Sequence, residues 1–151
     1  MAFEFSEGNL TLTIGKSFLV PTEMTNTGKT PAKNVHGNIA VGVFKKGEPL
    51  DFTYSAGHAH YGVNAGTIFP GGGIKQSFEA VEHGPQHAEA IIFTPELKDA
   101  LWKAQSFIIV HGRLEYTDAF GADHWTTYCR YVLHPDMISP DCMKYNDTDT
   151  N

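Results

Sequence analysis

Apolar and polar residues alternate with a period of two along several segments of the chain, which is typical of β-strands that bury one face. In the first of these segments, Leu10, Leu12 and Ile14 alternate with threonines. Further segments of this kind cover 17–25, a stretch that begins near residue 32, and 74–79, 107–117 and 124–133. Glycine, asparagine and proline residues, which favour turns, separate the segments, so the pattern predicts an all-β domain.

Two of these segments also indicate which side chains face the core. The inward-facing positions are Val35, Ile39, Val41 and Val43 in the earlier segment and Ile108, Val110, Leu114 and Tyr116 in the later one. His111, Arg113 and Glu115 alternate with the later set, so they should lie on the opposite face. We interpret that face as polar and solvated, with side-chain pairs between neighbouring strands.

Two segments depart from this pattern. The stretch 57–73 is rich in glycine and has no steady period, which indicates a loop with short edge pieces. Residues 95–103 are predicted to form a short helix, because Thr94 can cap its first turn and Pro95 suits its first position. Leucine and alanine residues at 97, 100, 101 and 104 give this helix one apolar stripe. We expect the helix to lie across one end of the sheet.

The size of the chain sets its domain organisation. A length of 151 residues suits one domain, and an apolar fraction of 41% is enough for one packed core. Residues 1–135 are predicted to form a β-sandwich of about seven or eight strands with one short helix. After Pro135 the apolar pattern fades, so we expect 136–151 to be a C-terminal tail that packs on the sandwich in part.

Charge and hydropathy exclude two classes of function. The net charge is −6, and the eleven Lys and Arg residues form no run, whereas nucleic-acid-binding proteins concentrate basic residues on one face. No segment approaches the roughly 20 apolar residues that cross a bilayer. The first residues lack the basic and apolar regions of a signal peptide. The sequence therefore leaves two interpretations, a cytoplasmic protein that starts at Met1 and a domain of a longer protein.

Two blocks of sequence carry a resemblance. The first is N-x-G-K-T-P-A at 26–32, which we interpret as turn chemistry rather than a binding loop, and the second is Y-x-D-x-F-G-x-x-H-x-T-x-x-C at 116–129. With them, the chain resembles a group of uncharacterised bacterial membrane-anchored proteins over most of its length. The resemblance implies an immunoglobulin-like β-sandwich outside the cytoplasm, preceded by membrane helices that this sequence lacks. No activity is established for the group, so no catalytic residue is implied.

The chain has two cysteines, Cys129 in a predicted strand and Cys142 in the tail. The resemblance implies a disulfide between them, because the group has paired cysteines at similar positions and a location outside the cytoplasm permits oxidation. The bridge would close a loop of about 14 residues, for which chain entropy gives roughly 3 kcal/mol. It would also hold the tail against the last strand. The alternative is two unrelated thiols in a cytoplasmic protein, with Cys129 buried as a small apolar residue.

Histidines supply the candidates for a metal site. His58 and His60 are two residues apart, so on a strand they would share one face, as ligands do in metal-binding β-barrels. No carboxylate follows them as in the cupin motif, and Pro85 argues against a helix that would align His83 with His87. We therefore predict no metal and no cofactor, and interpret these residues as solvated loop histidines. The alternative is a metal-dependent cupin-like enzyme that uses His58 and His60, with His83 or His87.

His124 follows a predicted turn at 118–123 and lies near Asp118 and Asp123 in the sequence. A pair with a carboxylate would stiffen the hairpin. A catalytic dyad also needs a nucleophile, and the chain has no G-x-S-x-G, His-Glu-x-x-His or Cys-x-x-Cys motif, so we predict a structural role. The aromatic residues that bracket the turn, and that we expect to be buried at one end of the sandwich, are Tyr116, Phe120 and Trp125.

These observations predict a domain that is not an enzyme. The main hypothesis is an extracytoplasmic β-sandwich of a membrane-anchored protein that mediates protein interaction, with an unknown protein partner and no nucleic acid. Contact with the membrane would run only through a segment outside this sequence. Besides the cupin-like enzyme, the alternative is a subunit of a cell-surface assembly, a homo-oligomer in which exposed edge strands pair between copies.

Overall fold

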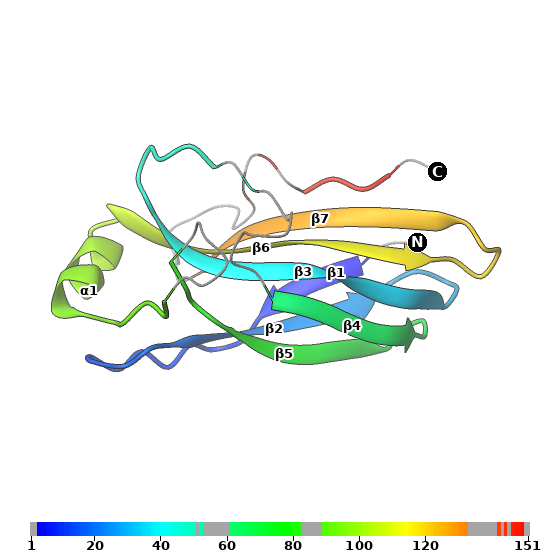
Figure 1. Cartoon of the computed structure of the whole chain (residues 1–151), viewed down its shortest axis with the longest axis horizontal. Helices are drawn as coiled ribbons and strands as arrows, with labels where there is room; N and C mark the ends of the chain where they lie inside the picture. The colour runs from blue at the N-terminus through cyan, green and yellow to red at the C-terminus, as the bar shows by residue number, and fades with distance from the viewer. Residues whose placement is uncertain are drawn as a thin grey trace.

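The computed structural model describes residues 3–50, 52, 61–82, 89–132, 142, 144 and 146–149. Two antiparallel sheets pack face to face (Figure 1). The first has the order β1-β2-β5, with β1 at Phe3–Glu7, β2 at Leu19–Asn26 and β5 at Gly73–Glu79. The second has the order β4-β3-β6-β7, with β4 at Tyr61–Ile68, β3 at Ala32–Lys45, β6 at Ser106–Thr117 and β7 at Asp123–Val132. The predicted all-β sandwich is thus confirmed.

The core lies between the two sheets and is built from the inward-facing positions of the strands. All the inward-facing residues predicted for β3 and β6 are buried except Val43, which is partly buried against the same core. From the three-stranded sheet, Val20, Met24 and Phe78 enter the core from the other side. The period of two therefore predicted the burial in the central strands correctly.

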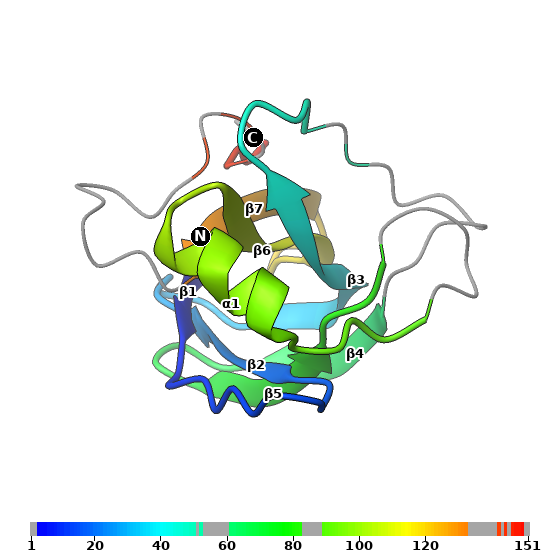
Figure 2. The same cartoon turned by 90° about the vertical axis from the view of Figure 1, so that its left-hand side faces the viewer.

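The helix α1 covers Pro95–Trp102, in agreement with the prediction, and lies across one end of the sandwich (Figure 2). Thr94 caps its first turn, since the Thr94 Oγ1 accepts a hydrogen bond of 3.1 Å from the N–H of Leu97. Leu101 is buried, and it joins the helix to the core between the sheets.

The prediction of a strand at 10–14 is wrong. These residues are irregular, and the first strand is β1, which pairs Phe3 with Asn26 at one end and Glu7 with Thr22 at the other. Leu10 and Leu12 still pack against the core, whereas Ile14 is 49% exposed. The alternation of leucines with threonines thus reflects partial burial without strand pairing.

The prediction of a loop with short edge pieces at 57–73 is correct in that an edge strand lies there, but it underestimates the length of this strand, β4, which has eight residues. Only Val63 and Ile68 of this strand are buried, because β4 has a neighbour on one side alone. Its pairing with β3 shifts register where Val35 lies opposite Gly66, which has a φ of 64°. Because few residues of β4 are buried and a bulge interrupts its pairing, its sequence shows no period of two.

A second apolar cluster covers the outer face of the four-stranded sheet. It consists of Phe44, Ile109, Cys129 and Cys142, with Leu50, Phe52, Phe107 and Tyr131 packed against it. His111 lies in this covered area, since it is 7% exposed and its ring stacks on Phe52 with centroids 3.6 Å apart. The predicted solvated face is therefore wrong at His111, because the chain that follows β3 folds back over it.

Phe120 lies at the tip of the turn between β6 and β7 and is 89% exposed, so the prediction that it is buried is wrong. The Asp118 carboxylate accepts hydrogen bonds from the N–H groups of Phe120 and Ala122, at 2.8 and 2.9 Å, which closes the turn. Gly121 takes a φ of 87°. The turn extends past the end of the three-stranded sheet (Figure 1), so Phe120 has no core to enter.

Candidate interaction surface

The histidines considered as metal ligands, His58, His60, His83 and His87, lie outside the described residues. Among the residues that the structure describes, no group of three or more His, Cys, Asp or Glu side chains is arranged to hold a metal ion. Within the described residues, polar side chains gather in two kinds of place. These are the hairpin of β6 and β7 and the outer faces of the two sheets.

Cys129 and Cys142 form a disulfide, with their Cα atoms 5.3 Å apart. The N–H of Cys142 donates a hydrogen bond of 2.9 Å to the Cys129 carbonyl. The side-chain amide of Asn146 continues this pairing, since it accepts from the N–H of Cys129 at 2.9 Å and donates to its carbonyl at 3.0 Å. Covalent and hydrogen bonds thus hold the C-terminal part of the chain to the middle of β7.

Beyond this point, residues 147–149 run along the free edge of β7. Thr148 forms an antiparallel bridge with Thr126, and the N–H of Thr127 donates to the Asp147 carbonyl at 2.8 Å. The N–H of Asp149 donates to the Trp125 carbonyl at 3.2 Å. The described end of the chain therefore acts as a short edge strand, which closes this side of the four-stranded sheet.

His124 lies between two carboxylates, one from the β6–β7 turn and one from this C-terminal segment. Its Nε2 is 2.9 Å from an oxygen of Asp118, and its Nδ1 is 2.7 Å from an oxygen of Asp149. The His124 side chain is 9% exposed and stacks on Tyr116, with ring centroids 5.3 Å apart. Because ionised carboxylates only accept, both of these contacts are hydrogen bonds when both ring nitrogens of His124 carry a proton. We call His124, Asp118 and Asp149 the imidazolium clamp.

The clamp shifts the pKa values of its members in opposite directions. Chiefly the hydrogen bond to Asp118 raises the pKa of His124, against the effect of burial. The same bond is the main reason that the pKa of Asp118 is lowered. Burial alone acts to raise the pKa of Asp149, but the hydrogen bonds from His124 and from the Trp125 N–H outweigh it and lower this pKa. Both imidazole nitrogens are occupied, so the clamp ties the chain together and leaves no free base for catalysis.

Next to the clamp, the outer face of the four-stranded sheet has a shallow pocket of about 330 Å³. Glu115 lies on it, 3.3 Å from a ring nitrogen of His36 and 3.5 Å from the guanidinium of Arg113. Arg113 in turn lies over the Trp125 ring, 4.7 Å from its centroid. These side chains satisfy one another at a solvent-exposed position, where such pairs contribute little.

Of the two aspartates near His124 in the sequence, Asp118 is the one that pairs with it, as expected. The second, Asp123, accepts a hydrogen bond of 2.9 Å from the Thr117 hydroxyl.

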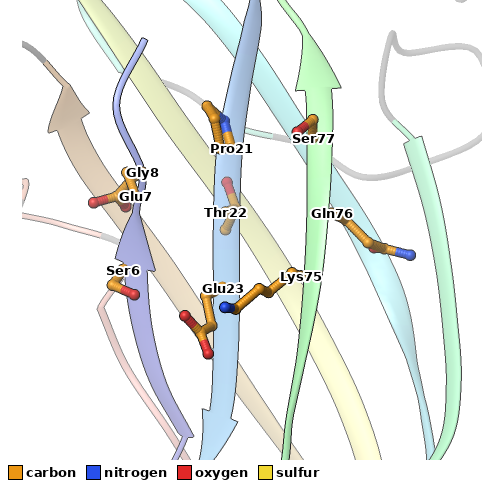
Figure 3. A pocket seen from close by; sticks show the side chains of 9 residues that line it. All are labelled: Ser6, Glu7, Gly8, Pro21, Thr22, Glu23, Lys75, Gln76 and Ser77. Atoms are coloured by element: carbon orange, nitrogen blue, oxygen red, sulfur yellow. The ribbon is translucent and has the colours of Figure 1, made fainter.

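The outer face of the three-stranded sheet is bare of any described segment, in contrast to the covered face on the other side. A hollow of about 320 Å³ lies in its middle, over Ser6, Pro21 and Ser77 (Figure 3). Glu23 and Lys75, at directly paired positions on β2 and β5, also line it. The small side chains in the middle keep the face low.

Apolar side chains gather at the end of this bare face that lies nearer α1. Leu19, the first residue of β2, is 52% exposed, and Ile92 is 45% exposed. Ile92 bridges to Ser17, two residues before Leu19, so both side chains emerge on the outer face as neighbours. Ile14, 49% exposed, lies close by, since the next residue, Gly15, bonds to the carbonyl of Phe93. We call Leu19, Ile92 and Ile14 the aliphatic patch.

One residue of β2 indicates this patch from the sequence alone. Within β2 the outward positions are Leu19, Pro21, Glu23 and Thr25. A leucine is unusual in that outward series. Ile92 gave no signal, because its orientation depends on the bridge to Ser17 across 75 residues of chain.

Comparisons with known proteins do not extend this description. No known family model matches the chain, and no curated protein matches it. Among solved structures, it is similar to one described as the X-ray structure of Northeast Structural Genomics Consortium target SoR45, with a TM-score of 0.38 and 10% identity over 97% of this chain and 94% of that one. The class of protein is thus defined by its own structure, as an all-β sandwich with one covered and one bare outer face.

Proposed function

We propose that this chain is a non-catalytic β-sandwich domain that mediates protein interaction, and that the bare face of β1, β2 and β5 is its docking surface. The observation that carries this proposal is the aliphatic patch beside a low sheet face. Neighbouring apolar side chains that stay exposed on a folded domain are typical of interaction sites. The covered face shows the contrast, since there the chain buries its own apolar residues.

We infer that the sandwich is of the immunoglobulin type. In that fold, the first, second and fifth strands share one sheet, and the third pairs with the last two in the other. The orders β1-β2-β5 and β4-β3-β6-β7 support this assignment, with β4 added beside β3. Domains of this class commonly serve recognition through loops or sheet faces on a rigid scaffold.

We further propose that the domain acts outside the cytoplasm as part of a membrane-anchored protein. The disulfide supports an oxidising location, because such bridges are rare in the cytosol. The resemblance to bacterial membrane-anchored proteins supports the anchor. Among the described residues, no helix has the length and apolar character needed to cross a bilayer, so the anchor would come from a segment outside this sequence.

The docking surface is tested by photo-crosslinking in native cells with a photoreactive amino acid at Leu19. The matched control carries the same probe at Phe120, which is more exposed, 89% against 52%, but lies at the turn between β6 and β7. We expect an adduct of one defined mass from Leu19 and none of that mass from Phe120. Equal labelling at both positions, or none at Leu19, would contradict the proposal.

A further inference from the structure

We propose that two copies of this chain pair through the free edges of their β5 strands, so that their three-stranded sheets join into one continuous sheet. The proposal goes beyond the proposed function, because it uses the edge of the sheet and leaves its outer face uncovered. Three features carry it: the backbone groups that β5 directs to its edge, the protection of the other sheet edges, and the order of charges along the strand.

The backbone of β5 has a row of hydrogen-bonding groups at its free edge. In the register that β5 keeps with β2, Ala80 lies directly opposite Phe18, and its N–H donates to the Phe18 carbonyl at 3.1 Å. Hydrogen-bonded positions of an antiparallel ladder alternate with positions whose N–H and C=O point away from the neighbour. Lys75, Ser77 and Glu79 therefore direct their backbone groups to the free edge. No hydrogen bond from a described segment beyond the sheet reaches the backbone of these three residues.

The strand is also open to water along this side. Among the described strands, β5 has β2 as its only neighbour in the sheet, and it lies at the lower margin of the molecule in Figure 1. Gln76 alternates with Lys75 and Ser77 and so belongs to the other face, yet all three residues are exposed. Figure 3 shows the Gln76 side chain extending sideways from β5, away from β2. An exposed, unpaired edge of this kind is a template for a further strand.

The other sheet edges are protected within the described part of the chain. Residues 147–149 pair along β7, and the guanidinium of Arg130 donates to the Phe5 carbonyl on β1. The pairing of β4 with β3 shifts register, and Gly66 in β4 has a φ of 64°. By contrast, β5 keeps one unbroken register with β2 over seven residues, without proline or positive φ. Because natural sheets use such devices against strand addition, the regular edge of β5 indicates a pairing site.

The charges along β5 make this edge complementary to itself. Lys75 and Glu79 lie two residues before and after Ser77, and all three side chains are on the outer face. When two copies pair antiparallel about Ser77, Lys75 of each copy lies opposite Glu79 of the other. All the opposed residues have their N–H and C=O at the free edge, so each pair can exchange two hydrogen bonds. Neither Lys75 nor Glu79 forms an ion pair with another described residue. Such reciprocal contacts are the requirement of a two-fold interface.

The remaining carboxylates of the outer face do not oppose this pairing. Glu23 is the partner of Lys75 on β2, so Lys75 would lie between Glu23 of its own copy and Glu79 of the second copy. Glu4 is on β1, at the far edge of the sheet. A two-fold axis perpendicular to the joined sheet keeps both outer faces on one side. The dimer would therefore present two aliphatic patches on one surface, which lets a partner of the bare face bind at two points.

Sedimentation velocity over a wide range of protein concentrations tests the proposal. The paired stretch covers only 75–79, so we expect a weak, reversible dimer that forms as the concentration rises. Ser77→Pro removes the N–H at the centre of the pairing and should abolish the dimer. The matched variant Ser77→Ala keeps this N–H and should leave the dissociation constant within about threefold of wild type. Both variants should keep the wild-type circular dichroism spectrum, because the Ser77 N–H does not bond to β2.

Charge variants test the register independently of proline. Lys75→Glu and Glu79→Lys should each raise the dissociation constant at least about tenfold, because like charges then lie opposite each other. The double variant restores opposite charges and should return to within about threefold of wild type. Leu19→Ser removes part of the aliphatic patch and should leave the dimer unchanged, since Leu19 lies on β2, outside the new pairing.

A wild-type domain that stays monomeric at every concentration overturns the proposal. A dimer that survives Ser77→Pro or is lost in Leu19→Ser also overturns it, because contact would then run through the face, and so does a double charge variant no better than the single ones. The proposed function is tested separately by the photoprobe at Leu19. A monomeric domain whose probe captures a different protein therefore refutes the pairing of β5 and leaves the proposed function standing.

Discussion

Replacing Asn26 by alanine should destabilise the domain by about 3 kcal/mol. Asn26 is fully buried at the end of β2, and its Nδ2 donates to the carbonyls of Thr30 and Ile68, each at 2.9 Å. Its Oδ1 accepts from the N–H of Gly28 at 2.9 Å. A hydrogen bond contributes about 1 kcal/mol, and a buried group left without its partner costs about 1–3 kcal/mol. Three bonds join the β2–β3 loop to the end of β4, so the estimate is roughly three such contributions.

Urea unfolding of the disulfide-bonded protein measures this change in the free energy of unfolding. In thermal unfolding, a loss of about 3 kcal/mol should lower the melting temperature by roughly 6–12 °C for a domain of this size. The matched control is Asn64→Ala, because Asn64 is exposed on β4 and should change stability by less than about 0.5 kcal/mol. Asn26→Asp should also destabilise at neutral pH and recover on acidification, since it places a carboxylate against two carbonyls. If Asn26→Ala matched the control, the argument from buried hydrogen bonds would be refuted.

Four further predictions concern the termini, the turn and the histidines. The hydrogen bonds that raise the pKa of His124 stabilise the fold below pH 6.5, and this stability is lost as the pH rises through the raised pKa. The interactions that lower the pKa values of its two carboxylates stabilise the fold above pH 3.8, and this stability is lost on further acidification. His124→Gln should therefore flatten the pH dependence of the free energy of unfolding above pH 6.5 and below pH 3.8, and change it little in between. Reducing the disulfide should cost roughly 3 kcal/mol, measured by urea unfolding. Phe120→Ala should change stability by less than about 0.5 kcal/mol by the same assay, so a larger loss would place Phe120 in a core. Elemental analysis should find no stoichiometric metal, and replacing His58 and His60 by alanine should leave the melting temperature unchanged.

The pattern of the sequence predicts those parts of the fold whose signal is local. The alternating strands β3 and β6 bury one face along their whole length, and α1 begins with a capping threonine and a proline, so both kinds of element are visible in short windows. The edge strand β4 is not, because it buries two residues of eight. A strand with one neighbour and a bulge has no periodicity to detect.

The positions of single side chains depend on contacts between distant segments, and there the pattern is insufficient. Phe120 is a large apolar residue of the kind that usually lies in a core, but the geometry of its turn directs its side chain to solvent. In the sequence Asn26 looks like an ordinary turn residue. In the structure its side chain is buried, where it donates a hydrogen bond to the carbonyl of Ile68, 42 residues away. His124 was expected to pair with one carboxylate, and the second comes from Asp149, 25 residues later, which no local pattern indicates.

The way the chain covers its own surfaces also bears on how copies would meet. Pairing through β7 is blocked, because residues 147–149 occupy its edge and the disulfide and Asn146 hold the chain there. The edge of β1 is restrained as well, since the guanidinium of Arg130 donates to the Phe5 carbonyl at 2.7 Å. Natural sheets protect their edges in this manner against uncontrolled strand addition. A domain that restrains these two edges and covers one face, yet leaves the aliphatic patch in water, limits contact between domains to the face of the three-stranded sheet and to the edges of β4 and β5, each of which has one neighbour in its sheet.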